Sequence, residues 1–438
     1  MPIDLESIAF DPADAKAALS QLPASPAVFA LYGAESKDEP YIGRTPNLRG
    51  RLERLLQPSP KHPRRLQLAG RVRRIAWRLT GSDFESLLTQ FSLLEEIYGA
   101  KALERMHLRA PAFVRFLGSN RYPRITVTNR PSQREAEWAY GPFASRAAAE
   151  RYAEEALKLF LLRRCTFDLD PDPSFPGCVY SEMKMCLAPC YKGCADERYG
   201  EEAAAIQGFL ATRGESRLVV LRSERDEASA RMEFETAAAI HAQVQRVENV
   251  RALAPELLRP LNQLRSVILQ ASANPVDVSV FLFDNGRLRG PAGFSTLGMR
   301  IQNEQSGSSS LFAHPLALEP VPETSEMKAQ GSEINMNRPA EANLESEPAV
   351  AAPTRPARGV LEARMDATLA ALTSSEEPLS GTIRQGHLAL LKRWYYRPEV
   401  RRPGEIFFPD AEGAWPVKAL LRGVGRVAAK MMTTPHRT

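Results

Sequence analysis

The sequence has few cysteines and no long apolar run, and each shortage excludes a class of protein. None of its 438 residues lies in an apolar stretch long enough to cross a bilayer, so we expect no transmembrane helix. The N-terminus carries acids where a secretory signal needs a basic start. All five cysteines lie between residues 165 and 194, unlike a secreted disulfide framework. We therefore expect a cytoplasmic protein without a membrane partner, whose clustered thiols bind metal or react.

Basic charge is concentrated in one segment, although the net charge is only +5. Residues 44–78 contain eleven lysines and arginines against one acid, Glu53. Such a block can neutralise phosphates and release their counterions, which gives affinity for nucleic acid without sequence preference. A solvated basic face is the alternative. We expect DNA as a partner. The bases are Arg44, Arg49, Arg51, Arg54, Lys61, Arg64, Arg65, Arg71, Arg73, Arg74 and Arg78.

The first hundred residues predict a small α+β domain. Three β-prone segments favour an antiparallel three-stranded sheet, and they are residues 27–32, 38–43 and 72–79. Thr45 as N-cap and Pro46 at the first helical position predict a helix through Leu56. Ser82 is expected to cap a second helix over residues 83–98.

Helices and one long polar segment dominate the rest of the pattern. Residues 196–253 read as helical, with a break near Gly214, and residues 276–289 predict a hairpin around Asn285-Gly286. Residues 303–357 are rich in Ser, Glu, Pro, Asn and Ala. We expect this segment to be a disordered linker, because it cannot bury enough apolar surface to offset ordering.

The motif Tyr41-Ile42-Gly43, followed by Arg44, Asn47, Leu48 and Arg51, resembles the GIY-YIG nuclease domain. The resemblance is to the version that opens the UvrC excinucleases. It implies hydrolysis of a DNA phosphodiester, in which Tyr41 helps to activate water and Arg51 stabilises the transition state. In the family a glutamate holds one divalent metal. The DNA-binding candidates are Arg44, Asn47, Arg49 and Arg54.

Three positions depart from the family pattern. The first-strand tyrosine is Phe29, the metal glutamate is Gln90, and the downstream asparagine is Val114. An amide is a poor sole ligand for Mg²⁺, which prefers carboxylates and water. Two functions therefore stay open. One is a DNA- and partner-binding role without cleavage, and the other is an active endonuclease that makes a single incision with Mg²⁺ or Mn²⁺.

The cysteine spacing resembles the cysteine region of the same family, which carries a 4Fe-4S cluster. The resemblance implies that Cys165, Cys178, Cys186 and Cys190 are the ligands and that Cys194 is spare. From spacing alone, four thiolates suit either a cubane or a tetrahedral zinc. Buried cysteines without a ligand are the remaining alternative.

Residues 224–247 resemble the UVR motif, a helical hairpin that in the family docks on the excinuclease component UvrB. The partner-binding candidates are Phe234, Glu235, Ala237, Ala238 and His241. The family's Arg-Asp pair is replaced by His241-Ala242. An ordinary hairpin within the protein's own core is the alternative.

These resemblances predict an order of units along the chain. They are an N-terminal extension (1–22), a GIY-YIG-like domain (23–115), a connecting region with the cysteines (116–195), the UVR hairpin (196–255), a small β-containing segment (256–302), the linker (303–357) and a C-terminal helical segment (358–438). Residues 387–409 resemble the approach to the family's second nuclease. We expect the ribonuclease-H-like and helix-hairpin-helix domains to be missing. The resemblance implies a protein of nucleotide excision repair.

Overall fold

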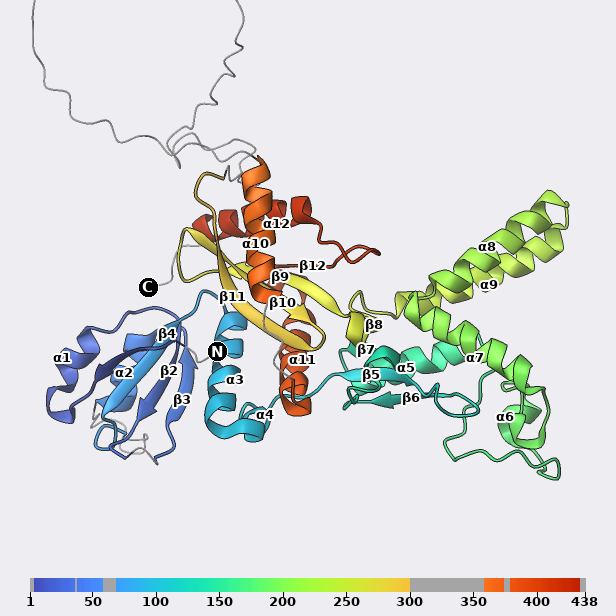
Figure 1. The fold of residues 1–438 in the computed structure, drawn as a ribbon, viewed down its shortest axis with the longest axis horizontal. Coiled ribbons are helices and arrows are strands. Elements are labelled where there is room, and N and C mark those ends of the chain that lie inside the picture. Colours follow the sequence, from blue (N-terminus) through green and yellow to red (C-terminus); the bar gives the residue numbers. More distant parts are fainter. Residues whose placement is uncertain (1–3, 36–37, 58–67, 300–357, 374–378, 434–438) are drawn as a thin grey trace, which may run out of the picture.

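The computed structural model describes residues 4–35, 38–57, 68–299, 358–373 and 379–433. Within them the chain forms three four-stranded antiparallel sheets with helices packed around them (Figure 1). The predicted linker over 303–357 lies outside the described residues, as do Lys61, Arg64 and Arg65 of the basic block. No helix of the described part combines the length and apolarity needed to cross a membrane.

The first sheet has the strand order β1-β4-β2-β3. Its strands are β1 (Glu6–Ala9), β2 (Ala27–Tyr32), β3 (Tyr41–Thr45) and β4 (Arg74–Leu79). The prediction of three strands was wrong by one, because β1 pairs with the edge of β4 through Ser7 and Ala76. None of the β1 residues is fully buried. Backbone pairing rather than an apolar pattern makes this segment a strand.

Helices α1 (Ala15–Ser20) and α2 (Leu48–Leu56) pack on one face of this sheet. The N-cap of α2 is Asn47, not Thr45 as predicted. The Asn47 side-chain oxygen accepts from the Gly50 N–H at 2.8 Å. The Thr45 hydroxyl instead donates to the Asn47 carbonyl oxygen at 2.9 Å. Thr45 therefore stabilises the turn between β3 and α2 rather than capping the helix.

Helix α3 (Asp83–Tyr98) matches its prediction and is buried on two sides. Ser82 caps it, accepting from the Glu85 N–H at 3.1 Å. One side brings Leu93 against Val28 and Ala30 of β2. The other side belongs to a separate apolar cluster that includes helix α11 (Gly381–Tyr395). Helix α3 therefore joins the first sheet to the C-terminal part of the chain.

The second sheet has the order β6-β5-β7-β8. Its strands are β5 (Ala112–Phe116), β6 (Ile125–Thr128), β7 (Ala139–Phe143) and β8 (Arg259–Pro260). Helices α5 (Arg146–Leu157) and α7 (Asp196–Ala211) share its apolar core. The short helices α4 (Ala102–Arg105) and α6 (Val179–Glu182) lie before β5 and within the cysteine segment.

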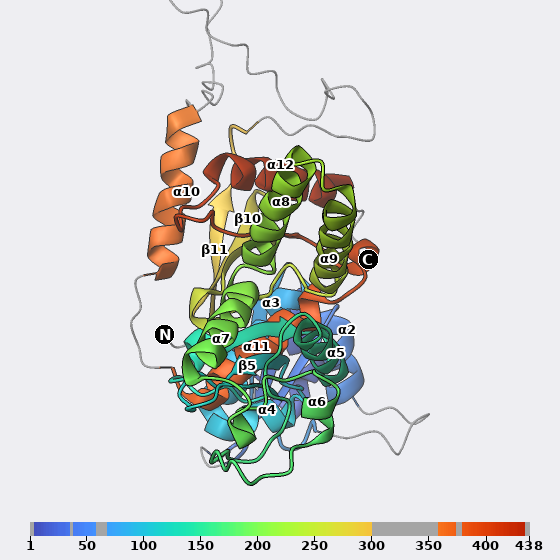
Figure 2. The same ribbon diagram turned by 90° about the vertical axis from the view of Figure 1, so that its right-hand side faces the viewer.

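Helices α8 (Glu215–Ala230) and α9 (Phe234–Ala252) form an antiparallel hairpin. It projects away from the three sheets (Figures 1 and 2). The break predicted near Gly214 is confirmed, since this glycine has φ of 88° and separates α7 from α8. A second break at Met232, with φ of 60°, turns the chain at the hairpin tip.

The third sheet has the order β11-β10-β9-β12. Strands β9 (Arg265–Ala271), β10 (Asp277–Asp284) and β11 (Arg287–Ser295) precede residues 300–357, and β12 (Glu405–Phe407) follows them. The predicted hairpin is confirmed, because Asn285 and Gly286 both have positive φ between β10 and β11. Helices α10 (Arg358–Thr373) and α12 (Val417–Thr433) cover one face. Helix α11 covers the other.

Candidate functional site

Phe29 and Tyr41 lie side by side on the α2 face of the first sheet. Their ring centroids are 6.1 Å apart. Phe29 is 1% exposed and pairs with Gly43 across β2 and β3. Helix α2, which carries Arg51, contributes Leu48 and Leu52 to the same apolar cluster. The structure thus places two of the predicted site positions together and sets the helix of the third on the same face.

Gln90 and Val114 lie elsewhere. Gln90 is partly buried on α3, one turn before Leu93, and α3 packs on the sheet face opposite Phe29. Val114 is fully buried in β5, where it belongs to the core of the second sheet. Val114 thus belongs to a different core from Phe29, and the helix that carries Gln90 packs on the other face of the first sheet.

Glu85, the nearest buried acid on α3, has a structural role. Its carboxylate accepts from the Gly81 N–H at 3.0 Å. Burial raises the pKa of Glu85, and the Gly81 hydrogen bond, the Arg78 charge and a Ser279 hydrogen bond only partly oppose this. The contact with Ser279 ties the start of α3 to β10. Glu85 thus helps to hold α3, which packs on the first sheet, against the third sheet.

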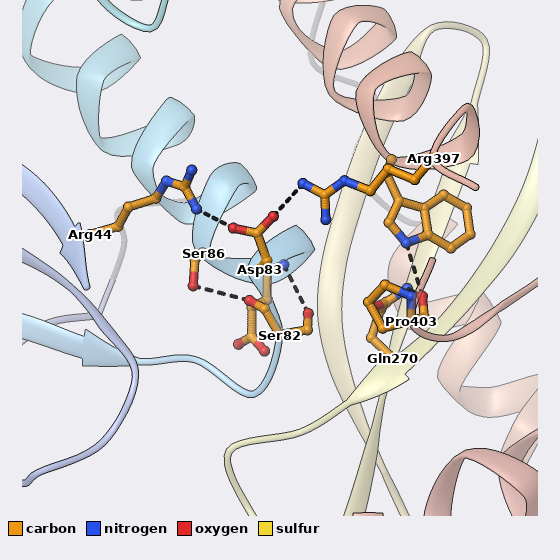
Figure 3. Close-up of polar contacts among 9 residues, drawn as sticks. Arg44, Ser82, Asp83, Ser86, Gln270, Arg397 and Pro403 are labelled. Atoms are coloured by element: carbon orange, nitrogen blue, oxygen red, sulfur yellow. Dashed lines mark hydrogen bonds and ion pairs between the residues drawn. The ribbon is translucent and has the colours of Figure 1, made fainter. Parts of the chain in front are cut away.

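Asp83 holds two arginines from distant parts of the chain. Its carboxylate forms ion pairs with Arg44 of β3 and with Arg397, the latter at 2.5 Å (Figure 3). Burial alone would raise the pKa of Asp83, but the hydrogen bond from Arg397 and the charge of Arg44 hold it below its usual value. Sequence reasoning assigned Arg44 to DNA and missed both Asp83 and Arg397. No local signal connects residues 314 positions apart.

The other two predicted DNA-binding arginines, Arg49 and Arg54, donate to backbone carbonyl oxygens. Arg49 donates to the Leu22 carbonyl oxygen at 2.7 Å, and Arg54 donates to the Gly50 carbonyl oxygen at 2.9 Å. A carbonyl partner orients a guanidinium without neutralising it, so both remain available to attract phosphate. Asn47, by contrast, uses its side-chain oxygen to cap α2.

The cysteines lie in an irregular segment between α5 and α7. Burial raises the pKa of Cys186 to about 11, and the thiols of Cys165, Cys190 and Cys178 add to this effect. The four predicted ligands are therefore close enough to interact electrostatically. In the part of the chain that the structure describes, no three His, Cys, Asp or Glu side chains form a group that could hold a metal ion.

Hydrogen-bond donors point to two of the sulfur atoms. The Ala188 N–H points to Cys186 Sγ at 3.3 Å, and Arg163 Nη1 points to Cys165 Sγ at 3.6 Å. Such donors are typical of thiolates that bind iron–sulfur clusters, so the donor set fits that group in composition. Burial raises the pKa of Cys194, and the charge of Asp196 adds to this effect.

Arg163 anchors this segment and escaped sequence reasoning. The side chain is 2% exposed and donates to the Tyr122 and Phe167 carbonyl oxygens at 3.0 and 2.9 Å. Tyr199 of α7 accepts from the Arg163 N–H at 3.1 Å. The run Arg163-Arg164-Cys165 was the available signal in the sequence. Arg163 fixes the point at which the cysteine segment leaves the second sheet.

The predicted partner-binding residues lie at the tip of the projecting hairpin and on the first turns of α9. Phe234 is 67% exposed, and Met232 beside it is 77% exposed. Glu235, Ala238 and His241 are also exposed. The core of the hairpin is made instead by valines on the inner face of α9 and by Leu218 and Leu221 of α8. Four of the five candidate positions are therefore exposed, and Ala237 is partly buried.

Comparison with known proteins finds a matching family for the middle of this chain. A family model described as "UvrC/Cho excinuclease, middle domain" matches residues 113–209. Over this segment the chain is UvrC-like. That range contains β6, β7 and nearly all of β5 from the second sheet, the five cysteines and most of α7. The similarity therefore covers the region that holds the candidate metal ligands.

Curated relatives extend the similarity. UvrABC system protein C of Alcanivorax borkumensis is 28% identical over 52% of this chain and 37% of its own length. The protein of the same name from Aliivibrio fischeri is 24% identical over 62% of the chain and 42% of its own length. That of Ruminiclostridium cellulolyticum is 25% identical over 68% and 48%. The match spans less than half of each relative. No solved structure matches.

Proposed function

We propose that this chain is a UvrC-like component of nucleotide excision repair that binds DNA through its N-terminal domain without cutting it. The domain would be a GIY-YIG nuclease fold whose catalytic site has degenerated. One observation carries this proposal. Phe29, at the position of the first catalytic tyrosine, is 1% exposed and packs its ring against Tyr41 and Gly43. This position serves packing and offers no hydroxyl to water.

The metal position supports the same conclusion. A GIY-YIG nuclease needs a carboxylate to hold its divalent ion, which polarises the phosphate. Position 90 carries an amide, and the buried Glu85 nearby is committed to the Gly81 N–H and to Ser279. DNA binding does not need this ion, because the charges of Arg49, Arg51 and Arg54 attract phosphate directly.

A nicking assay separates this role from that of an active endonuclease. Purified protein is incubated with supercoiled plasmid and with damaged duplex in Mg²⁺ or Mn²⁺. We expect no nicking above background. Metal-dependent nicking that disappears in Tyr41→Phe and in Arg51→Ala would overturn the proposal, since these two residues would then be performing the family's chemistry.

Two further assignments belong to the proposal. Cys165, Cys178, Cys186 and Cys190 would hold a 4Fe-4S cluster, with zinc as the alternative, and the Ala188 and Arg163 donors would stabilise the thiolates. The exposed hairpin tip would bind UvrB, with Phe234 as the apolar anchor. The matching family is described as an excinuclease, which supports a DNA partner. The relatives' name, UvrABC system protein C, supports a protein partner.

A further inference from the structure

The C-terminal end of α11 carries a second concentration of positive charge. Residues 392–402 contain five lysines and arginines against one acid, Glu399. Arg393 and Arg401 are exposed, and no ion pair involves either of them within the described residues. This basic run lies more than three hundred positions after the basic block at 44–78, and sequence reasoning gave it no role.

The fold brings the two basic segments together. Helices α3 and α11 pack antiparallel, since Phe84 contacts Trp394 at 5.4 Å between ring centroids and Phe91 contacts His387 at 5.5 Å. The end of α11 therefore lies beside the start of α3. There Asp83 bridges Arg44 and Arg397, so the two segments meet at a single carboxylate (Figure 3).

The same end of α11 also reaches the other two sheets. The Tyr396 hydroxyl donates to the Pro142 carbonyl oxygen of β7 at 2.7 Å. Trp394 Nε1 and the Gln270 amide of β9 both donate to the Pro403 carbonyl oxygen at 3.0 Å. These contacts fix the loop after α11 at the junction of the three sheets. The charges there are held on a rigid support.

Positive charges lie close to one another at this junction. Burial lowers the pKa of Lys392, and the charge of Arg109 lowers it further. Asp83 pairs with an arginine from each of the two basic segments, so it already holds two guanidinium groups. Phosphate oxygens from outside the protein would relieve this repulsion.

We propose that the basic end of α11, through Arg393 and Arg401, forms a second contact for the DNA phosphate backbone, next to the N-terminal basic block. DNA bound to the N-terminal domain then continues across the junction of the three sheets. This inference rests on the proposed DNA-binding function and adds a surface to it. It assigns DNA positioning to the C-terminal part of the chain.

Fluorescence anisotropy with a labelled DNA duplex at several salt concentrations tests the inference on the full chain. The variant Arg393→Ala/Arg401→Ala should lose about tenfold or more in affinity, and its salt slope should fall by roughly 1.8, at about 0.9 per lost phosphate contact. The matched control is Lys418→Ala/Arg422→Ala. It removes two exposed charges from α12, on the other face of the third sheet, and should change neither quantity.

The outcomes separate this inference from the function on which it rests. If the wild-type protein binds DNA and Arg51→Ala/Arg54→Ala weakens binding, while the α11 variant matches wild type, the α11 contact is wrong and the N-terminal interface stands. If wild type does not bind the duplex at all, the proposed function itself fails. Thermal melting shows whether each variant stays folded, which we expect because Arg393 and Arg401 are exposed.

Discussion

The ring of Phe29 lies directly over Gly43 on the neighbouring strand. A Cβ atom added at position 43 would come within 2.7 Å of Phe29 Cζ, closer than van der Waals contact allows. The glycine of the Tyr-Ile-Gly motif is thus required by packing between β2 and β3. A phenylalanine at position 29 uses the space that this glycine leaves.

The first prediction follows from this contact. Gly43→Ala should destabilise the protein by about 1–3 kcal/mol, because the added methyl overpacks a buried aromatic ring. Urea unfolding measures the loss. Gly70→Ala is the matched control, since no atom lies within 4 Å of the position a Cβ would take there. Equal effects of the two substitutions would show that Phe29 is not the cause.

The second prediction concerns the cysteines. Protein purified without oxygen should be brown and contain iron, and Cys186→Ala should abolish both the colour and the bound iron. Cys194→Ala should retain them, because Cys194 lies outside the proposed set of four ligands. Metal analysis and absorbance spectroscopy provide the measurement. Stoichiometric zinc without iron in wild-type protein would reject the iron–sulfur assignment.

The third prediction concerns the hairpin tip. Phe234→Ala should weaken binding to purified UvrB by about 2 kcal/mol or more, as expected for an exposed aromatic anchor. Stability should change by less than about 0.5 kcal/mol, because the side chain is 67% exposed. Val219→Ala, at a 59% exposed position on α8, is the control. Equal loss of affinity in both variants would argue against a specific tip contact.

Local features of this fold could be predicted from the sequence, and long-range pairings could not. Ser82 as a cap and the turn at Asn285-Gly286 depend on neighbouring residues, so their patterns were visible. Strand β12, by contrast, pairs with β9 across more than a hundred residues, and only tertiary contact makes this short segment a strand. The ion pair between Asp83 and Arg397 could not be predicted for the same reason. The sequence thus suggested individual residues of the candidate site, but not which of them contact each other in the folded protein.

The fourth prediction concerns the ion pairs of Asp83. Asp83→Asn should cost roughly 1 kcal/mol of unfolding free energy, reduced by solvent screening because the side chain is 36% exposed. The lowered pKa means that this stabilisation is present above the ordinary value of 3.8 and is lost as the pH falls through the lower folded value. The control is Glu39→Gln, which removes the more exposed ion pair with Arg105. Its effect on urea unfolding should be close to zero, and a loss as large as that of Asp83→Asn would contradict a special role for the bridge.

The last prediction concerns His387, which is buried between α11 and the third sheet. Burial lowers its pKa to about 3, from an ordinary value of 6.5, and the charges of Arg287 and Arg289 contribute. The neutral ring accepts from the Leu288 N–H through Nδ1 at 3.2 Å. Below pH 6.5 the unfolded chain takes up a proton at this position that the folded protein does not. The free energy of unfolding should therefore fall as the pH decreases, by about 2 kcal/mol between about pH 7 and pH 5.

The variant His387→Asn tests this directly, because an amide oxygen can still accept from the Leu288 N–H but does not titrate. Urea unfolding of both proteins across this pH range should give a steep decline for wild type and a flatter curve for the variant. Both proteins contain the same carboxylates, so the difference between the two curves isolates the histidine. Parallel curves would mean that His387 is protonated in the folded protein. The junction between α11 and the third sheet would then tolerate a buried charge beside two arginines, contrary to the packing described above.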